Sequence, residues 1–246
     1  MTRLSKIAVS LILTSMIITA SLLSLRYLPL RIINGYEIRG CETTYEISKM
    51  LSSLIGRGFF QLRIGALKSN LERLPYINHV SSSYKKGMLY LDIVPAEKGL
   101  ILKSSSNSYF LHDDVLSLIN SKDSEALDRM YLRLNLGDGY LNYMIKYGFD
   151  SYFENTINML TDLSDYHNLI DKAEYDNNKS TGKGELTLTM NSLKAKLRVS
   201  DAISSNRLES AIAVIKEEQW KDGKSVFLDS PVNYELRSGQ LVRLKG

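Results

Sequence analysis

The chain has 246 residues, of which 44% are hydrophobic and 24% are charged, and this composition excludes wholesale disorder. Its single cysteine excludes an internal disulfide and a zinc site made of cysteines alone. The net charge of +4 comes largely from Arg3, Lys6 and Arg26. The remaining chain is nearly neutral and lacks the concentrated basic face that nucleic-acid binding needs, so no nucleic-acid partner is expected.

The N-terminal segment carries an uncharged run from Ile7 to Leu25. As a helix this run would span roughly 28 Å, close to the ~30 Å hydrocarbon core of a bilayer. A cleaved signal peptide would need a shorter apolar stretch and a small-residue cleavage site, which residues 18–20 match poorly. The sequence therefore predicts a short cytoplasmic head over 1–6 and a transmembrane helix over 7–27. A single-pass protein of the cytoplasmic membrane is expected, with its N-terminus cytoplasmic and its C-terminal body extracytoplasmic or periplasmic.

Residues 28–97 show the pattern of a small α+β module. The run Thr43–Glu46 is typical of a capping box, with Thr43 as the predicted N-cap, and apolar residues at helical spacing follow it. Pro75 ends a second helical pattern, and strict alternation then predicts a hairpin around the turn 85–87. The predicted order is β-α-α-β-β, with elements at 31–38, 47–55, 67–74, 76–84 and 88–94.

Residues 98–246 predict a larger mixed α/β domain built on a mainly antiparallel sheet. Short alternating segments suggest strands, and longer segments with helical spacing suggest helices. Helices are predicted at 140–163 and 207–220, and strands at 99–102, 108–111, 130–134, 169–175, 185–190, 194–199, 225–228, 232–236 and 240–244.

Four segments together resemble the FtsQ/DivIB family of cell-division proteins, whose first extracytoplasmic domain is a POTRA domain. They are Gly-Phe-Phe at 58–60, Leu-Glu-Arg-Leu-Pro-Tyr-Ile at 71–77, Gly-Met-Leu-Tyr-Leu-Asp-Ile at 87–93, and the closing segment 226–237. The resemblance implies an anchor, a POTRA domain over 28–97 and an FtsQ-type β domain over 98–246. It also implies a non-enzymatic, bitopic scaffold of the divisome that acts in septum assembly at the division site.

The resemblance also implies partners. In the family, the closing strands of the β domain bind the FtsB–FtsL coiled-coil pair, and FtsK-like and septal synthase proteins are further expected partners. Strand addition would supply the contact, because an exposed edge offers unpaired amides and carbonyls. The alternative is that these positions are ordinary core and edge residues. The expected partner-binding residues are Val226, Phe227, Leu228, Tyr234 and Leu236.

No catalytic constellation is visible in the sequence. The three histidines are scattered, without the spacing of metal ligands. The segment 222–225 ends like a phosphate-binding loop but lacks its first glycine, and no nucleophile elbow is present. We therefore expect no enzyme activity, cofactor, metal or small-molecule substrate. The alternative function is a POTRA-containing accessory protein of polypeptide transport or outer-membrane assembly, although such proteins usually carry several POTRA copies or a barrel-forming region.

Overall fold

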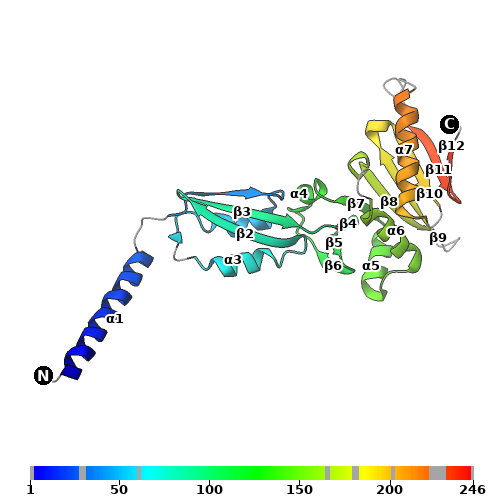
Figure 1. The fold of residues 1–246 in the computed structure, drawn as a ribbon. Helices are drawn as coiled ribbons and strands as arrows, with labels where there is room; N and C mark the ends of the chain where they lie inside the picture. The colour runs from blue at the N-terminus through cyan, green and yellow to red at the C-terminus, as the bar shows by residue number, and fades with distance from the viewer. Residues whose placement is uncertain are drawn as a thin grey trace. The chain divides into compact units, whose positions relative to one another are not determined.

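The computed structural model describes residues 3–27, 32–59, 62–163, 167–178, 183–200, 203–221 and 231–244. The chain divides into two compact units, Met1–Pro95 and Ala96–Gly246. Figure 1 labels their helices and strands in chain order. The structure is α+β with a large mixed sheet, so this part of the predicted fold class is confirmed.

Helix α1 spans Arg3–Tyr27 and contains the uncharged run of the sequence. Across the ranges described, no helix is long and apolar enough to cross a membrane. Apolar residues dominate α1 between 11 and 23. Hydroxyl residues interrupt this stretch, and Thr19 Oγ1 donates to the carbonyl of Ser15 at 2.7 Å. The predicted transmembrane helix over 7–27 is therefore wrong, and so is the predicted single-pass location in the cytoplasmic membrane.

The rest of the first unit is a three-stranded sheet with two helices. Strand β3 lies in the middle of the strand order β1-β3-β2, parallel to β1 and antiparallel to β2. The chain order is β-α-α-β-β, as the sequence pattern predicts. The elements are β1 Gly35–Arg39, α2 Tyr45–Ser52, α3 Ile64–Leu71, β2 Ile77–Lys85 and β3 Met88–Pro95.

A buried threonine begins helix α2. The N-cap is Thr44, one residue after the predicted Thr43, and its hydroxyl accepts the amide hydrogen of Ile47 at 3.3 Å. The same hydroxyl shares a hydrogen bond of 2.8 Å with the phenol of Tyr76, and this bond links the start of α2 to the segment before β2. The shift arises because Thr44 is almost fully buried and needs a partner there, which a sequence pattern does not reveal. The core below it is formed by Ile47, Leu51, Leu71, Val80, Leu89, Leu91 and Ile93.

The second unit contains a nine-stranded mixed sheet in the order β12-β11-β10-β9-β8-β7-β4-β5-β6. Three neighbouring pairs are parallel, namely β4 with β7, β7 with β8, and β10 with β11, and the other pairs are antiparallel. The strands are β4 Leu100–Lys103, β5 Ser108–His112, β6 Val115–Leu118, β7 Leu132–Leu136, β8 Lys172–Asn178, β9 Lys183–Met190, β10 Ala195–Val199, β11 Val232–Arg237 and β12 Gln240–Arg243. The helices are α4 Ser124–Asp128, α5 Asp138–Tyr147, α6 Ser151–Thr161 and α7 Ser205–Lys221, with short 3₁₀ turns at His167–Leu169 and Asn191–Leu193.

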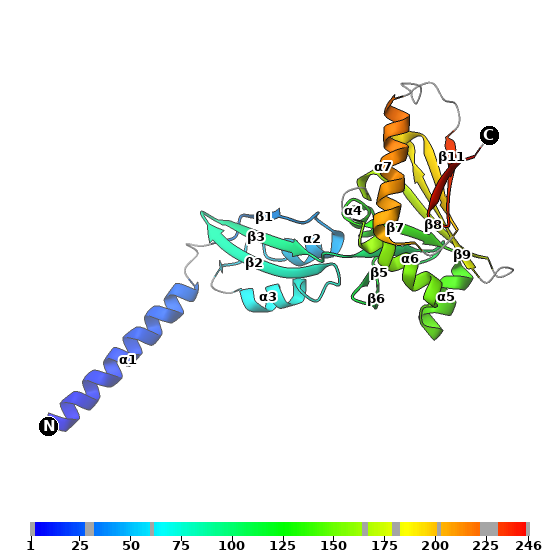
Figure 2. The same ribbon diagram turned by 45° about the vertical axis from the view of Figure 1, so that its right-hand side comes forward.

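One face of this sheet carries the main core of the unit. Along β10, Ala195, Leu197 and Val199 are buried, while Lys196 and Arg198 between them are exposed. Helices α6 and α7 pack against each other, and α7 lies across the strands β8 to β11 in both views (Figures 1 and 2). Around β10 the apolar side of the sheet is therefore covered by helices and the other side is polar, whereas at β4 and β5 the opposite side is also buried, by Ile101 and Phe110.

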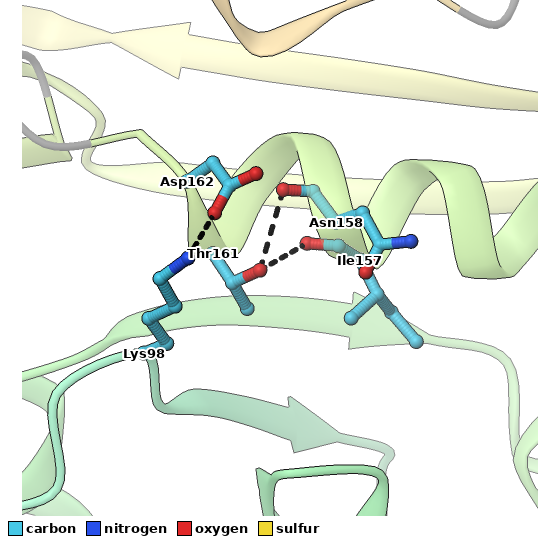
Figure 3. A network of polar contacts seen from close by, with 5 residues as sticks. All are labelled: Lys98, Ile157, Asn158, Thr161 and Asp162. Carbon is cyan, nitrogen blue, oxygen red and sulfur yellow. Dashed lines mark hydrogen bonds and ion pairs between the residues drawn. The ribbon is translucent and has the colours of Figure 1, made fainter.

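A polar contact joins the chain just before β4 to the end of α6 (Figure 3). The Lys98 ammonium lies 2.7 Å from Asp162 Oδ1, and the hydrogen bond to this carboxylate raises the pKa of Lys98. Beside it, Thr161 Oγ1 donates to the carbonyl of Ile157 at 3.0 Å, which closes the last turn of the helix. Because both charged side chains are largely exposed, this ion pair orients the two segments more than it stabilises them.

Candidate partner-binding edge of the large sheet

The expected partner-binding residues fall into two groups. Val226, Phe227 and Leu228 lie outside the described residues. Tyr234 and Leu236 lie on strand β11, and both side chains are almost fully buried. Strand β11 pairs with β10 on one side and with β12 on the other, so its backbone is not an open edge. In this structure, Tyr234 and Leu236 therefore face the core.

Tyr234 connects β11 to the end of helix α7. Its hydroxyl accepts a hydrogen bond from Gln219 Nε2 at 2.9 Å and donates one to Glu218 Oε2, also at 2.9 Å. Burial of the ring raises the pKa of Tyr234, which keeps the phenol protonated and able to donate. The residue thus holds in place the strand on which β12 is built.

Strand β12 is reached through a tight hairpin. The two residues between β11 and β12, Ser238 and Gly239, have φ values of 50° and 75°. Positive φ at both positions is typical of the type I′ turn, which matches the twist of paired strands. A Cβ on Gly239 would lie 2.6 Å from the guanidinium of Arg207, a flexible side-chain end that can move aside, so the positive φ is what favours glycine here.

The outer side of β12 offers backbone groups for pairing. Within the described residues β12 is the last strand of the sheet, and it pairs only with β11. The amide of Leu244 donates to the carbonyl of Asn233 at 2.9 Å. Since ladder bonds alternate along an antiparallel strand, Val242 also points its backbone groups toward β11. Leu241 and Arg243 then point their amides and carbonyls away from the sheet.

The outer strand β12 carries one exposed apolar side chain, that of Val242, and exposed arginines surround it. The side chain of Val242 is 48% exposed. Arg207, Arg237 and Arg243 are exposed around the hairpin, and Glu235 is the one acidic residue of β11 and β12. This edge therefore suits an extended segment that brings an apolar residue and acidic neighbours.

Of the predicted partner-binding residues, Tyr234 and Leu236 lie on β11, one strand inside β12, which is the last described strand at this side of the sheet. The alternation at 240–244 does predict a strand, and Ser238-Gly239 is a recognisable hairpin turn. Together these signals could have identified the final strand as the edge. Leu241, Val242 and Arg243 are the residues that this reading would have added.

The described residues were also searched for groups of side chains that could bind a metal ion. Across the described ranges, no three His, Cys, Asp or Glu side chains are grouped so that they could hold a metal ion.

Neither a scan against protein-family models nor a search of curated proteins finds a match to the chain.

Proposed function

We propose that the chain is a non-enzymatic binding protein of the cell-division machinery, which holds a partner polypeptide as an added strand on β12. The observation that carries this proposal is the outer side of β12, where the backbone groups of Leu241 and Arg243 have no strand partner among the described residues. Strand addition to such an edge supplies affinity through main-chain hydrogen bonds. The resemblance of 58–93 and 226–237 to the FtsQ/DivIB family supports cell division as the setting.

The partner that fits best is an extended segment attached to a coiled-coil pair of the FtsB and FtsL kind. Val242 would contact an apolar side chain of the added strand. Arg237 and Arg243 would favour acidic residues beside it, because opposite charges across an interface steer association and select partners. No bound substrate or chemical step is part of this function.

Photo-crosslinking in dividing cells tests the proposal directly. A photoreactive residue at Val242 should capture a small coiled-coil division protein, whereas the same residue at Lys196 on the exposed face of β10 should not. Depletion of the protein should also block septation. Equal capture at both positions, or normal septation after depletion, would contradict the proposal, and capture of barrel precursors would favour the transport alternative.

A matched pair of variants isolates the backbone contact. Arg243→Pro removes an outward amide without removing a bond to β11, and edge strands tolerate proline at such positions. Arg243→Ala removes only the side chain. We expect the proline variant to lose the crosslink at 242 and the alanine variant to keep most of it. If both behave alike, the contact is made by the side chain and strand addition is wrong.

A further inference from the structure

A cavity of 620 Å³ opens at the ends of two parallel strands, away from β12. Strands β7 and β8 run parallel, and Leu136 is paired with Tyr175 near the carboxyl end of each. Ligand sites commonly form at the carboxyl ends of parallel strands, where the following helices diverge. Helices α5 and α6, green in Figures 1 and 2, follow β7 along the chain. The cavity is lined by Gly137, Gly139, Tyr140, Tyr143, Asp150, Tyr175, Asp176 and Asn177.

Aromatic rings form a fixed wall of this cavity. The rings of Tyr140 and Tyr175 are stacked with centroids 5.7 Å apart, and Phe153 packs edge-on against Tyr140 at 5.6 Å. Tyr175 is almost fully buried, so its position is set by packing. Burial raises the pKa of Tyr175 to about 12 and also raises the pKa of Tyr140. Both phenols therefore stay neutral, and their ring faces present negative electrostatic potential.

Two carboxylates supply the charge of the cavity. Three hydrogen bonds fix the side chain of Asp150. Its Oδ1 accepts hydrogen bonds from the amides of Tyr152 and Phe153 at 3.1 Å and 2.9 Å, and its Oδ2 accepts one from the hydroxyl of Tyr140 at 2.5 Å. Asp176 lies on β8 and is exposed. The described lining includes no Lys, Arg or His, so no cation of the lining itself neutralises these carboxylates.

We infer that this cavity binds an arginine side chain of a partner polypeptide, which stacks on the accessible rings of Tyr140 and Tyr143 and pairs with the carboxylates. Arginine fits better than lysine because its planar guanidinium can stack on a ring and bind a carboxylate through two hydrogen bonds. The site lies four strands away from β12 in the sheet order and does not depend on the proposed function.

The surface beside the cavity favours a polypeptide over a small amine. Tyr143 lines the cavity and is 51% exposed, and its ring lies 5.0 Å from that of Tyr147, which is 64% exposed. Exposed tyrosines next to a pocket are typical of protein interfaces, where they cover the residues that flank an anchoring side chain. The cavity volume of 620 Å³ also exceeds that of one arginine side chain, so there is room for the residues that flank it.

Binding of defined peptides to the full chain tests this inference. The probes are Ac-Ala-Leu-Arg-Leu-Ala-amide, the same peptide with citrulline, and arginine amide alone. Citrulline keeps the shape of arginine without its charge. We expect the arginine peptide to bind at least tenfold more tightly than either other probe, as measured by fluorescence anisotropy with unlabelled competitors. Equal binding of the citrulline peptide would overturn the cationic site, and equal binding of arginine amide would overturn the polypeptide partner.

Three variants, each of which replaces a carboxylate with a neutral amide, locate the contact. Asp176→Asn and Asp150→Asn should each weaken the arginine peptide at least fivefold, and asparagine at 150 keeps a helix-capping side chain. Glu125→Gln makes the same charge change at an exposed position on α4 and should leave binding unchanged. Unchanged binding in both aspartate variants would overturn the inference. Arg243→Pro, which disrupts the proposed contact on β12, should leave binding of the arginine peptide unchanged. This variant therefore tests the cavity independently of the proposed function.

Discussion

The phenol ring of Tyr175 lies directly over the backbone of Gly184 on the neighbouring strand. A Cβ on Gly184 would lie 1.7 Å from the Tyr175 hydroxyl oxygen and 2.0 Å from the ring carbon that carries it. Strands β8 and β9 are antiparallel, and Gly184 is paired with Asn177, two residues beyond Tyr175. A glycine within a strand often marks such a close approach, here by an aromatic ring that covers its bare backbone.

Replacing Gly184 with alanine should displace this ring. The added methyl group cannot fit unless Tyr175 moves, and Tyr175 is packed against Tyr140 and Phe153. Overpacking of this kind costs about 1–3 kcal/mol, so we expect Gly184→Ala to lower the free energy of unfolding of the second unit by that amount. Urea denaturation followed by tyrosine fluorescence measures the change.

Gly139→Ala is the matched control for this substitution. Gly139 lies in helix α5, and nothing lies within 4 Å of the position of an added Cβ. Alanine in a helix is favoured over glycine by about 0.5–1 kcal/mol, so this variant should be unchanged or more stable. Equal destabilisation by the two substitutions would show that the Tyr175 contact is not the cause.

Local sequence patterns predicted where the strands and helices lie better than they predicted which strands pair with one another. The alternation at 194–199 and 232–236 correctly predicts strands, which the structure has at Ala195–Val199 and Val232–Arg237, because a half-buried strand repeats every two residues. The same alternation does not identify the two strands that pair with a given strand in the sheet. Tyr234 was therefore expected at an interface, whereas in the structure its side chain is buried on the face of the sheet that α7 covers.

The aromatic cavity could not be predicted for a related reason. Tyr140, Asp150 and Tyr175 meet because β7 and β8 are parallel neighbours with α5 and α6 between them in the chain. None of these residues belongs to a short motif, and their spacing carries no recognisable chemistry. The hydrogen bond between Tyr140 and Asp150 depends on the turn between two helices, which a helical pattern over 140–163 does not resolve.

The hydroxyl of Tyr234 should contribute measurably to stability. Tyr234→Phe keeps the buried ring but leaves Gln219, whose side chain is buried, without this hydrogen-bond acceptor. An unsatisfied buried polar group costs about 1–3 kcal/mol, so we expect a loss within this range in urea denaturation. Tyr147→Phe is the control, because Tyr147 is 64% exposed and its hydroxyl can be solvated. A loss of the same size in both variants would contradict a specific role for the Tyr234 hydroxyl.

The thiol of Cys41 should react slowly while the protein is folded. Burial, together with the neighbouring Glu42 carboxylate, raises the pKa of Cys41 to about 11. Only the thiolate attacks disulfide reagents, and an unfolded cysteine has a pKa of about 8.5. At pH 8 the folded protein should therefore react with Ellman's reagent about 200-fold more slowly than the protein in urea.

The same shift predicts how stability changes at high pH. Because the pKa is higher in the folded state, folding favours the protonated thiol. Its contribution to stability is fully present below the unfolded value of about 8.5 and is lost as the pH rises through about 11. Relative to Cys41→Ser, which does not titrate in this window, the original protein should lose additional stability between these pH values. Parallel stability curves for the two proteins, or equal thiol reactivity in the folded and unfolded states, would show that Cys41 is not desolvated in solution.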